Sequence, residues 1–296
     1  MPKKPNQPTP QERRRSRKAF RQAMTKELRE HRSSFLVFSV LRVLILVALV
    51  RQLMRGSYES AFFCVLALVL LYLPSWLQVK LRVELPPPLE ITILCFIFAA
   101  EILGEVNAFY VVVPNWDTML HTLNGFLAAA VGLSMVILLN DNEKVVFDLS
   151  PFFLALLAFC FSMTIGVLWE FFEFFMDSFF GMDMQKDTVV HAIHSVTLDP
   201  TRTNQVVTIS GITDTIVVTA DGAETSLGLG GYLDIGIIDT MKDLFVNFLG
   251  ALVFSVSGYF YARSRGKKKS PALNFVPTRK TPEQDYLQQA QEEEQP

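Results

Sequence analysis

Acidic and histidine side chains near the ends of apolar segments are the residues of this chain with the types and spacing for chemistry. They form four pairs: Glu101 with Glu105, Asp117 with His121, Glu170 with Glu173, and Asp239 with Asp243. The members of each pair are three or four residues apart, so on a helix they share one face. Charged groups bordering hydrocarbon are costly and usually face a protein interior or a water-filled cavity. The pattern therefore predicts a single polar site.

A divalent cation is the ligand that this set of side chains favours. Carboxylate oxygens with one imidazole suit Mg²⁺, Ca²⁺ or Mn²⁺, and also Zn²⁺. The predicted metal ligands are Asp117, His121, Glu170, Glu173, Asp239 and Asp243. Two alternatives stay open: the carboxylates share protons, or they cap helix ends and pair with one another.

Proton transfer is the second chemistry that these residues could support. His121, Glu170 and Asp243 are the predicted catalytic acids or bases. Glu101, Glu105, Asn124 and Asn247 are expected to extend the polar site. Arg42, inside another apolar segment, is a candidate partner for Glu101.

The elements that position these residues are predicted to be membrane-spanning helices. Half of the 296 residues are hydrophobic and 25 are Phe, which excludes an ordinary soluble enzyme. A helical span needs about 20 apolar residues. Six segments qualify: Ser34–Met54, Glu59–Leu77, Leu89–Tyr110, Met119–Asn140, Pro151–Phe172 and Asp243–Ala262. The predicted class is thus an all-α polytopic membrane protein.

Basic residues beside these spans predict the orientation, because Lys and Arg gather on the cytoplasmic side. The basic start of the chain, Lys80 with Arg82, and the run after Arg263 all agree, whereas Arg51 and Arg55 dissent. We therefore expect a multi-pass protein of the cell membrane with both termini cytoplasmic. All four acidic or histidine pairs then lie toward the outer boundary.

Two further regions are expected on either side of the six-helix membrane domain of residues 33–262, and a third is expected as an insertion within it. Residues 1–32 form a basic arm and residues 263–296 a tail, both predicted to be disordered. Residues 181–232 are predicted to be a small β-rich extracytoplasmic insertion between the fifth and sixth helices. Its β-branched runs are Gln205–Ile209 and Thr215–Thr219, and Asp221-Gly222 is a hairpin signal.

Several other patterns carry little functional weight. The three cysteines lie at unrelated spacings within apolar runs and are interpreted as packing residues. His191 and His194 would share a face only on a helix. Gly228–Gly231 lacks the spacing of a dinucleotide-binding loop. Common hydrolase and metalloprotease motifs are absent from the sequence.

Three ordered polar motifs resemble known membrane families. They are Trp116-Asp117-x-x-Leu120-His121-x-x-x-Gly125, the Glu170/Glu173 pair, and Asp239-Thr240-x-x-Asp243-x-x-x-Asn247-x-x-Gly250-Ala251. Together they resemble the YjdF-like family of bacterial inner-membrane proteins and, more distantly, the VanZ-like family linked to teicoplanin resistance. The resemblance covers about Leu89–Ala262. It implies a setting in the bacterial cell envelope and supplies no reaction.

Three functions remain open from the sequence. The first is a cation-binding protein or enzyme acting on a lipid-linked or headgroup substrate at the outer boundary. The second is a proton- or cation-coupled transporter, and the third is a structural or accessory envelope protein without catalysis. Membrane lipids are the expected partners, with anionic headgroups beside the basic arm, and nucleic acid is not expected. No pattern in the sequence indicates an oligomeric state.

Overall fold

The computed structural model describes residues 10–140, 149–264 and 275–293. The described part of the chain forms two compact units, Met1–Ser162 with Asn247–Pro296, and Met163–Val246. The helices are α1 (Pro10–Glu27), α2 (Arg32–Arg55), α3 (Tyr58–Leu70), α4 (Leu73–Leu81), α5 (Pro87–Ile97), the π-helix η1 (Phe98–Val106), α6 (Phe109–Val112), α7 (Trp116–Asn140), α8 (Pro151–Phe180), α9 (Ile237–Arg263) and α10 (Tyr286–Glu293).

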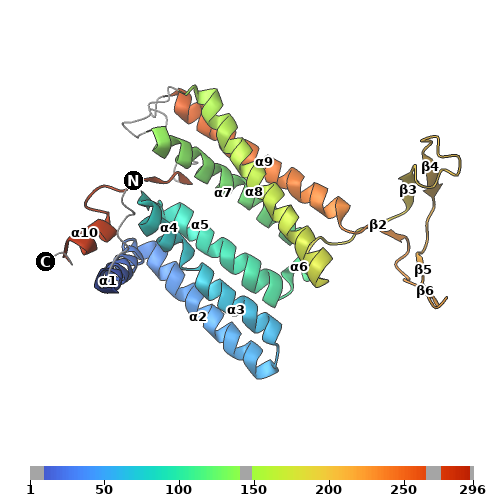
Figure 1. Cartoon of the computed structure of the whole chain (residues 1–296), viewed down its shortest axis with the longest axis horizontal. Coiled ribbons are helices and arrows are strands. Elements are labelled where there is room, and N and C mark those ends of the chain that lie inside the picture. The colour runs from blue at the N-terminus through green and yellow to red at the C-terminus, as the bar shows by residue number, and fades with distance from the viewer. Residues whose placement is uncertain (1–9, 141–148, 265–274, 294–296) are drawn as a thin grey trace, which may run out of the picture. The chain divides into compact units, whose positions relative to one another are not determined.

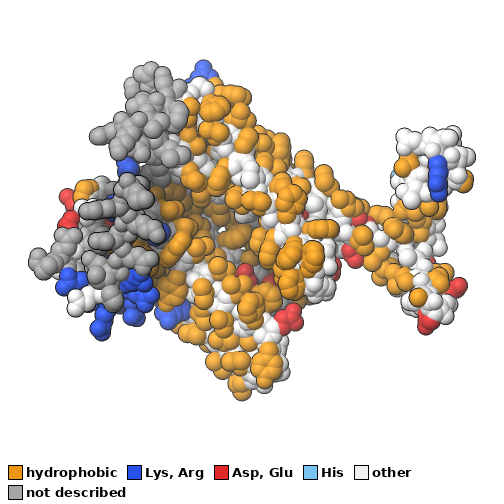
Figure 2. Space-filling model, viewed as in Figure 1, with side chains coloured by type: hydrophobic (Ala, Val, Ile, Leu, Met, Phe, Trp, Pro, Cys, Tyr) orange, Lys and Arg blue, Asp and Glu red, His pale blue; other side chains and the backbone are white. Residues whose placement is uncertain are grey.

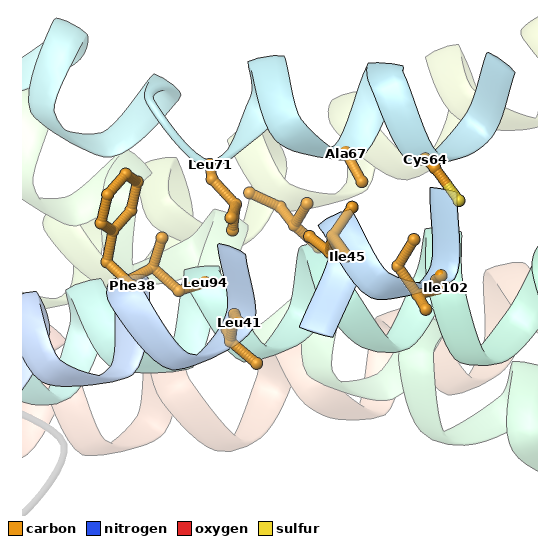
Figure 3. Close-up of a cluster of buried hydrophobic side chains, with 10 residues drawn as sticks. Phe38, Leu41, Ile45, Cys64, Ala67, Leu71, Leu94 and Ile102 are labelled. Atoms are coloured by element: carbon orange, nitrogen blue, oxygen red, sulfur yellow. The ribbon is translucent and has the colours of Figure 1, made fainter. Parts of the chain in front are cut away.

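The first unit contains a helical layer formed by α2, α3, α5 and η1, which pack against one another (Figure 1). Its apolar core includes Phe38, Ile45, Leu71 and Leu94, whose side chains meet between these helices (Figure 3). The outer face of α2 exposes large apolar side chains such as Val43 and Val47. Hydrophobic side chains cover much of the helical surface seen in Figure 2. Apolar helix faces on both the inside and the outside are typical of a membrane domain.

Local sequence signals explain where these helices begin and end. α2 is capped by Gly56, which has a φ of 72° and whose N–H donates hydrogen bonds to the carbonyls of the last turn. α8 begins with Pro151, and the hydroxyl of Ser150 accepts a hydrogen bond from the N–H of Phe153 at 3.3 Å.

Five helices of the described residues are long and apolar enough to cross a membrane. They are Arg32–Arg55, Tyr58–Leu81 (α3 and α4 taken together as one span), Trp116–Val136, Pro151–Phe180 and Ile237–Arg263. The multi-pass helical architecture expected from the sequence is thus present, whereas the count of six spans stays a prediction.

The third expected span, Leu89–Tyr110, is the segment that differs from a regular membrane helix. Its α-helical part, α5, ends at Ile97, and the chain continues as the π-helix η1 to Val106. Ala108 then adopts a left-handed conformation with a φ of 57°, which ends the helical path before α6. Apolar composition alone cannot reveal such a change of winding, because composition reports hydrophobicity and not the spacing of the backbone hydrogen bonds.

A second apolar cluster of the first unit joins α7, the first turns of α8 and the later turns of α9. Its buried members are mostly small, including Ala129, Ala130, Ala158 and Ala251, and they surround Phe254. Small residues let membrane helices approach closely.

The described parts of both terminal segments, residues 10–32 and 275–293, contain helices and a strand, whereas residues 1–9, 265–274 and 294–296 of the segments expected to be disordered lie outside the described residues. The N-terminal segment contains α1, and the tail contains α10 and the strand β8 (Thr278–Arg279), which pairs antiparallel with β1 (Val83–Glu84). α1 packs against α10 and α4. The reason is that a buried stripe of Ala19, Ala23 and Glu27 lies at helical spacing within the charged α1 sequence.

The second unit contains the later turns of α8, the first turns of α9 and six short strands between them. The strands form three antiparallel pairs: β2 (Val189–Val190) with β7 (Tyr232–Leu233), β3 (Ala192–Ser195) with β4 (Val207–Ser210), and β5 (Ile216–Val218) with β6 (Glu224–Ser226). Asp221-Gly222 lies in the turn between β5 and β6, where Gly222 has a φ of 82°. The β-rich character predicted for this segment is therefore present, and its extracytoplasmic side stays a prediction.

Candidate functional site

Asp117 and His121 lie one turn apart at the start of α7, in the first unit. His121 is buried, and its Nε2 lies 3.6 Å from Asp117 Oδ1. Trp116, next to this pair, packs its ring edge-to-face against Phe109, with the ring centroids 4.9 Å apart. A carboxylate at this distance can orient the imidazole ring.

One turn further along α7, a buried polar connection joins three helices of the first unit. Asn124 Nδ2 donates to Asn247 Oδ1 of α9 at 3.2 Å, and Asn247 Nδ2 donates to the carbonyl of Ser162 of α8 at 3.5 Å. The hydroxyl of Ser162 in turn donates to the carbonyl of Gly125 at 2.7 Å. Asn124 and Asn247, both expected at the polar site, are thus brought together.

Two glycines allow α7 and α9 to approach closely enough for this connection. A Cβ added at Gly125 would lie 2.1 Å from the carbonyl oxygen of Asn247, and one added at Gly250 would lie 2.0 Å from the carbonyl oxygen of Thr122. Both distances are far below van der Waals contact. Only glycine fits at these two crossings, which sets the register of α7 against α9.

Glu170 and Glu173 share one face of α8 in the second unit. Both are buried, with 4% and 7% of their surface exposed, whereas the neighbouring Phe171 and Phe174 are 65% and 59% exposed. The indole Nε1 of Trp169 donates to Glu173 Oε1 at 2.8 Å. The acids therefore face the protein while the phenyl rings face outward, as expected of a helix in lipid.

The end of α8 and the start of α9 are connected by hydrogen bonds within the second unit. Both carboxylate oxygens of Asp177 accept backbone N–H groups, from Met184 at 2.6 Å and Gln185 at 2.8 Å. The side chain of Gln185 donates to Thr240 Oγ1 at 2.6 Å. Sequence reasoning missed this Gln185–Thr240 contact because a lone glutamine carries no spacing signal.

Asp239 belongs to the same set of contacts. Its Oδ2 accepts the backbone N–H of Lys186 at 2.8 Å, so this predicted metal ligand also holds the connecting segment. Asp243, one turn further along α9, is 1% exposed. Asp243 and Asn247 are four residues apart on α9 and share one face of that helix.

Glu101 and Glu105 lie in the π-helix η1 of the first unit. Glu101 is half-buried and Glu105 is exposed. Arg42 has its guanidinium over the ring of Tyr72, 5.9 Å from the centroid, rather than paired with Glu101. A cation over an aromatic ring is an interaction that charge matching in the sequence does not predict.

His194 lies in β3 and His191 in the bend before it, so the two do not share a helical face. His194 Nδ1 lies 2.9 Å from Thr208 Oγ1 of the paired strand, and His191 Nδ1 lies 3.1 Å from the carbonyl oxygen of Ile212. Both imidazoles take part in contacts within the strand region.

The candidate acids and His121 can form hydrogen bonds, bind a metal ion or transfer a proton. The first unit supplies the Asp117–His121 pair, and the second supplies the buried faces of α8 and α9 with Glu170, Glu173 and Asp243. Carboxylates are hard oxygen ligands and imidazole is a borderline nitrogen ligand, and both bind divalent cations.

A comparison with protein families finds one match. The sequence profile described as "Predicted membrane protein (DUF2238)" matches residues 36–264, which include every candidate site residue named above. The match confirms the resemblance to YjdF-like membrane proteins. No curated protein and no solved structure matches the chain. Since the match covers most of the sequence, the chain belongs to the DUF2238 family of membrane proteins.

Proposed function

We propose that this membrane protein binds a divalent cation through acidic side chains and His121 at the end of the membrane domain where α7 and α9 begin. The proposed ligands are Asp117, His121, Glu170, Glu173 and Asp243, five of the six side chains that the sequence predicts as metal ligands. Asp239 is better assigned to holding the connecting segment, since its carboxylate accepts the N–H of Lys186.

The Asn124–Asn247 hydrogen bond is the observation that carries this proposal. It matches one position of α7 with one position of α9 inside the first unit, and the close approach at Gly125 and Gly250 supports the same register. His121 lies about one turn before Asn124 on α7, and Asp243 lies one turn before Asn247 on α9. Helical periodicity therefore supports corresponding positions for the imidazole and the carboxylate.

The face of α8 supports the proposal in the same way. Ser162 contacts Gly125 and Asn247 in the first unit. Glu173 follows Ser162 by 11 residues on one continuous helix. Eleven residues are close to three full turns, so Glu173 points in nearly the same direction as Ser162. Glu170, three residues earlier, shares that face.

A bound cation in this position suits a substrate that carries phosphate. The cation would hold the phosphate of a lipid-linked or headgroup substrate, and His121, Glu170 or Asp243 would transfer a proton. The proposed protein is therefore either an enzyme that acts on envelope lipids or a protein that binds them.

Metal analysis of purified protein tests the proposal. We expect wild-type protein to retain a divalent cation after exchange into chelator-free buffer, and Asp243→Asn and Glu170→Gln to lose it while still accumulating in the membrane. Glu59→Gln is the matched control, because Glu59 is an exposed acid at the start of α3. Wild-type protein without metal, or an equal metal content in all variants, contradicts the proposal.

A transporter is the second candidate, favoured by the winding of η1. π-helical segments are frequent at functional sites, and η1 carries both Glu101 and Glu105. A proton pathway through η1 predicts that Glu101→Gln abolishes proton or cation flux in reconstituted vesicles, while Glu59→Gln does not. Absence of flux in the wild-type protein rejects this candidate.

A further inference from the structure

The basic side chains of α1 surround a shallow cleft at the chain's N-terminal end. Its volume is about 750 Å³. It is lined by Arg14, Arg17, Lys18, Arg21, Gln22, Thr25, Lys26 and Glu293. Figure 2 shows Lys and Arg side chains gathered in the region of α1. Five cations and a single carboxylate therefore face one open space, which favours an anionic ligand.

This basic surface is displayed on a fixed helix rather than on a disordered arm. Ala19 and Ala23 of α1 are buried, and so is Ala290 of α10, the helix against which α1 packs. Arg14, Arg17 and Arg21 follow one another at three- and four-residue spacing along a different, exposed face. A rigid basic face binds with less loss of conformational entropy than a flexible one.

Ionic contacts at the end of α1 attach it to the rest of the first unit. The ammonium of Lys280, just after β8, forms an ion pair with Glu27 and lies 3.4 Å from Glu84 Oε2 of β1. His31 Nε2 lies 2.8 Å from the other oxygen of Glu84. Tyr286 of α10 donates its hydroxyl proton to Glu30.

The position of α1 along the chain brings the cleft close to the membrane boundary. α1 ends at Glu27, and α2, the first candidate span, begins at Arg32. α4 packs against α1 and exposes Trp76, a residue type enriched at membrane interfaces. The basic side chains of α1 are therefore held near the membrane surface, where lipid headgroups are the most concentrated anions.

We propose that this cleft is a binding site for the phosphate of anionic phospholipid headgroups. Arginine guanidinium groups donate paired hydrogen bonds to phosphate oxygens, and Lys18 and Lys26 add charge. Gln22, which also lines the cleft, supplies a neutral amide donor. The site is independent of the proposed cation site, since it uses none of the same residues.

Competitive lipid binding to the full-length protein in neutral detergent tests this site. Native mass spectrometry would count the phosphatidylglycerol and phosphatidylcholine molecules retained from an equimolar mixture. We expect a preference for phosphatidylglycerol that Arg17→Gln/Arg21→Gln lowers by about fivefold for each charge removed, and that added salt weakens. The control Arg55→Gln/Arg202→Gln removes the same charge from exposed positions outside the cleft and should keep the preference.

Four outcomes would overturn the proposal. The first two are equal retention of the two lipids by the wild-type protein, and a loss of preference in the control variant equal to that in Arg17→Gln/Arg21→Gln. The third is that inorganic phosphate displaces the bound lipid as well as a short-chain phosphatidylglycerol does at the same concentration. The fourth is that a single-stranded oligonucleotide binds more tightly than that lipid. The elution volume and helical circular dichroism of both double variants establish that they remain folded.

Discussion

At the scale of single residues, two glycines decide how closely the helices that carry the polar side chains can approach. Gly250 of α9 faces the backbone of α7, whereas Gly258, two turns later on the same helix, faces only the side-chain end of Leu133. These two positions offer a matched comparison, since both lie in the interior of α9 and both gain the same helix propensity from alanine.

Gly250→Ala is expected to destabilise the protein, because its Cβ would lie 2.0 Å from the carbonyl oxygen of Thr122 and the helices would have to separate. Overpacking of this kind costs about 1–3 kcal/mol. Gly258→Ala should be close to neutral, since the methyl of Leu133 at 3.1 Å can move. The thermal unfolding temperature of the two variants in detergent measures the difference. Equal unfolding temperatures would show that α7 and α9 are not in close contact at Gly250.

At the scale of secondary-structure elements, the end of α1 is held by a buried group of charges. Glu27 is 3% exposed and its carboxylate faces Lys280, with Glu84, Glu90 and His31 around it. Burial raises the pKa of Glu27 from 4.5 to about 7, even though the hydrogen bond from Lys280 acts in the opposite direction. The protonated form of Glu27 is thus favoured when α1 is packed.

The packing of α1 and α10 is therefore expected to weaken as the pH rises. A carboxyl group whose pKa is raised in the folded state stabilises that state below its unfolded pKa of 4.5, and this contribution is lost as the pH rises through about 7. Hydrogen–deuterium exchange of Tyr286–Glu293, corrected for the intrinsic exchange rate, should show less protection at about pH 8 than at about pH 5.

The variant Glu27→Gln separates this effect from other titrating groups. A neutral amide of the same shape cannot ionise, so the pH dependence of protection in α10 should become smaller. A pH dependence as large as that of the wild type would show that Glu27 is not the group responsible. Tyr286 itself contributes no titration in this range, because burial and the contact with Glu30 raise its pKa further above its usual value.

At the scale of the whole molecule, the predicted topology with both termini cytoplasmic can be tested by labelling. Cys64, Cys95 and Cys160 lie in helices α3, α5 and α8, so they are first replaced by alanine. Single cysteines are then placed at Thr225 in β6 and at Arg13 in α1, both of which are exposed.

A membrane-impermeant maleimide is expected to label Thr225→Cys in intact cells and Arg13→Cys only after permeabilisation. The reason is that the flanking basic residues favour a cytoplasmic start, and α8 and α9 connect the strand region to two membrane helices. Labelling of Arg13→Cys in intact cells would reverse the orientation and would place the acidic site on the cytoplasmic side.

Much of the architecture could be predicted from local properties of the chain. Long apolar runs predicted the helices that are long enough to cross a membrane, and β-branched runs with Asp221-Gly222 predicted the strands β4 and β5 and the turn after β5. The family match likewise agrees with the polar motifs seen in the sequence. Hydrophobicity and turn chemistry act over a few residues, so the sequence by itself determined these features.

Tertiary structure alone decided which polar groups meet. The contact of Asn124 with Asn247 joins residues that are 123 positions apart, and the ion pair of Glu27 with Lys280 joins residues 253 apart. Tertiary packing also brings α1 against α10, two segments whose composition indicated disorder. It likewise places the guanidinium of Arg42 over the ring of Tyr72. Such contacts depend on helix register and packing distance, which are set by shape complementarity between distant segments and leave no periodic signal in either one.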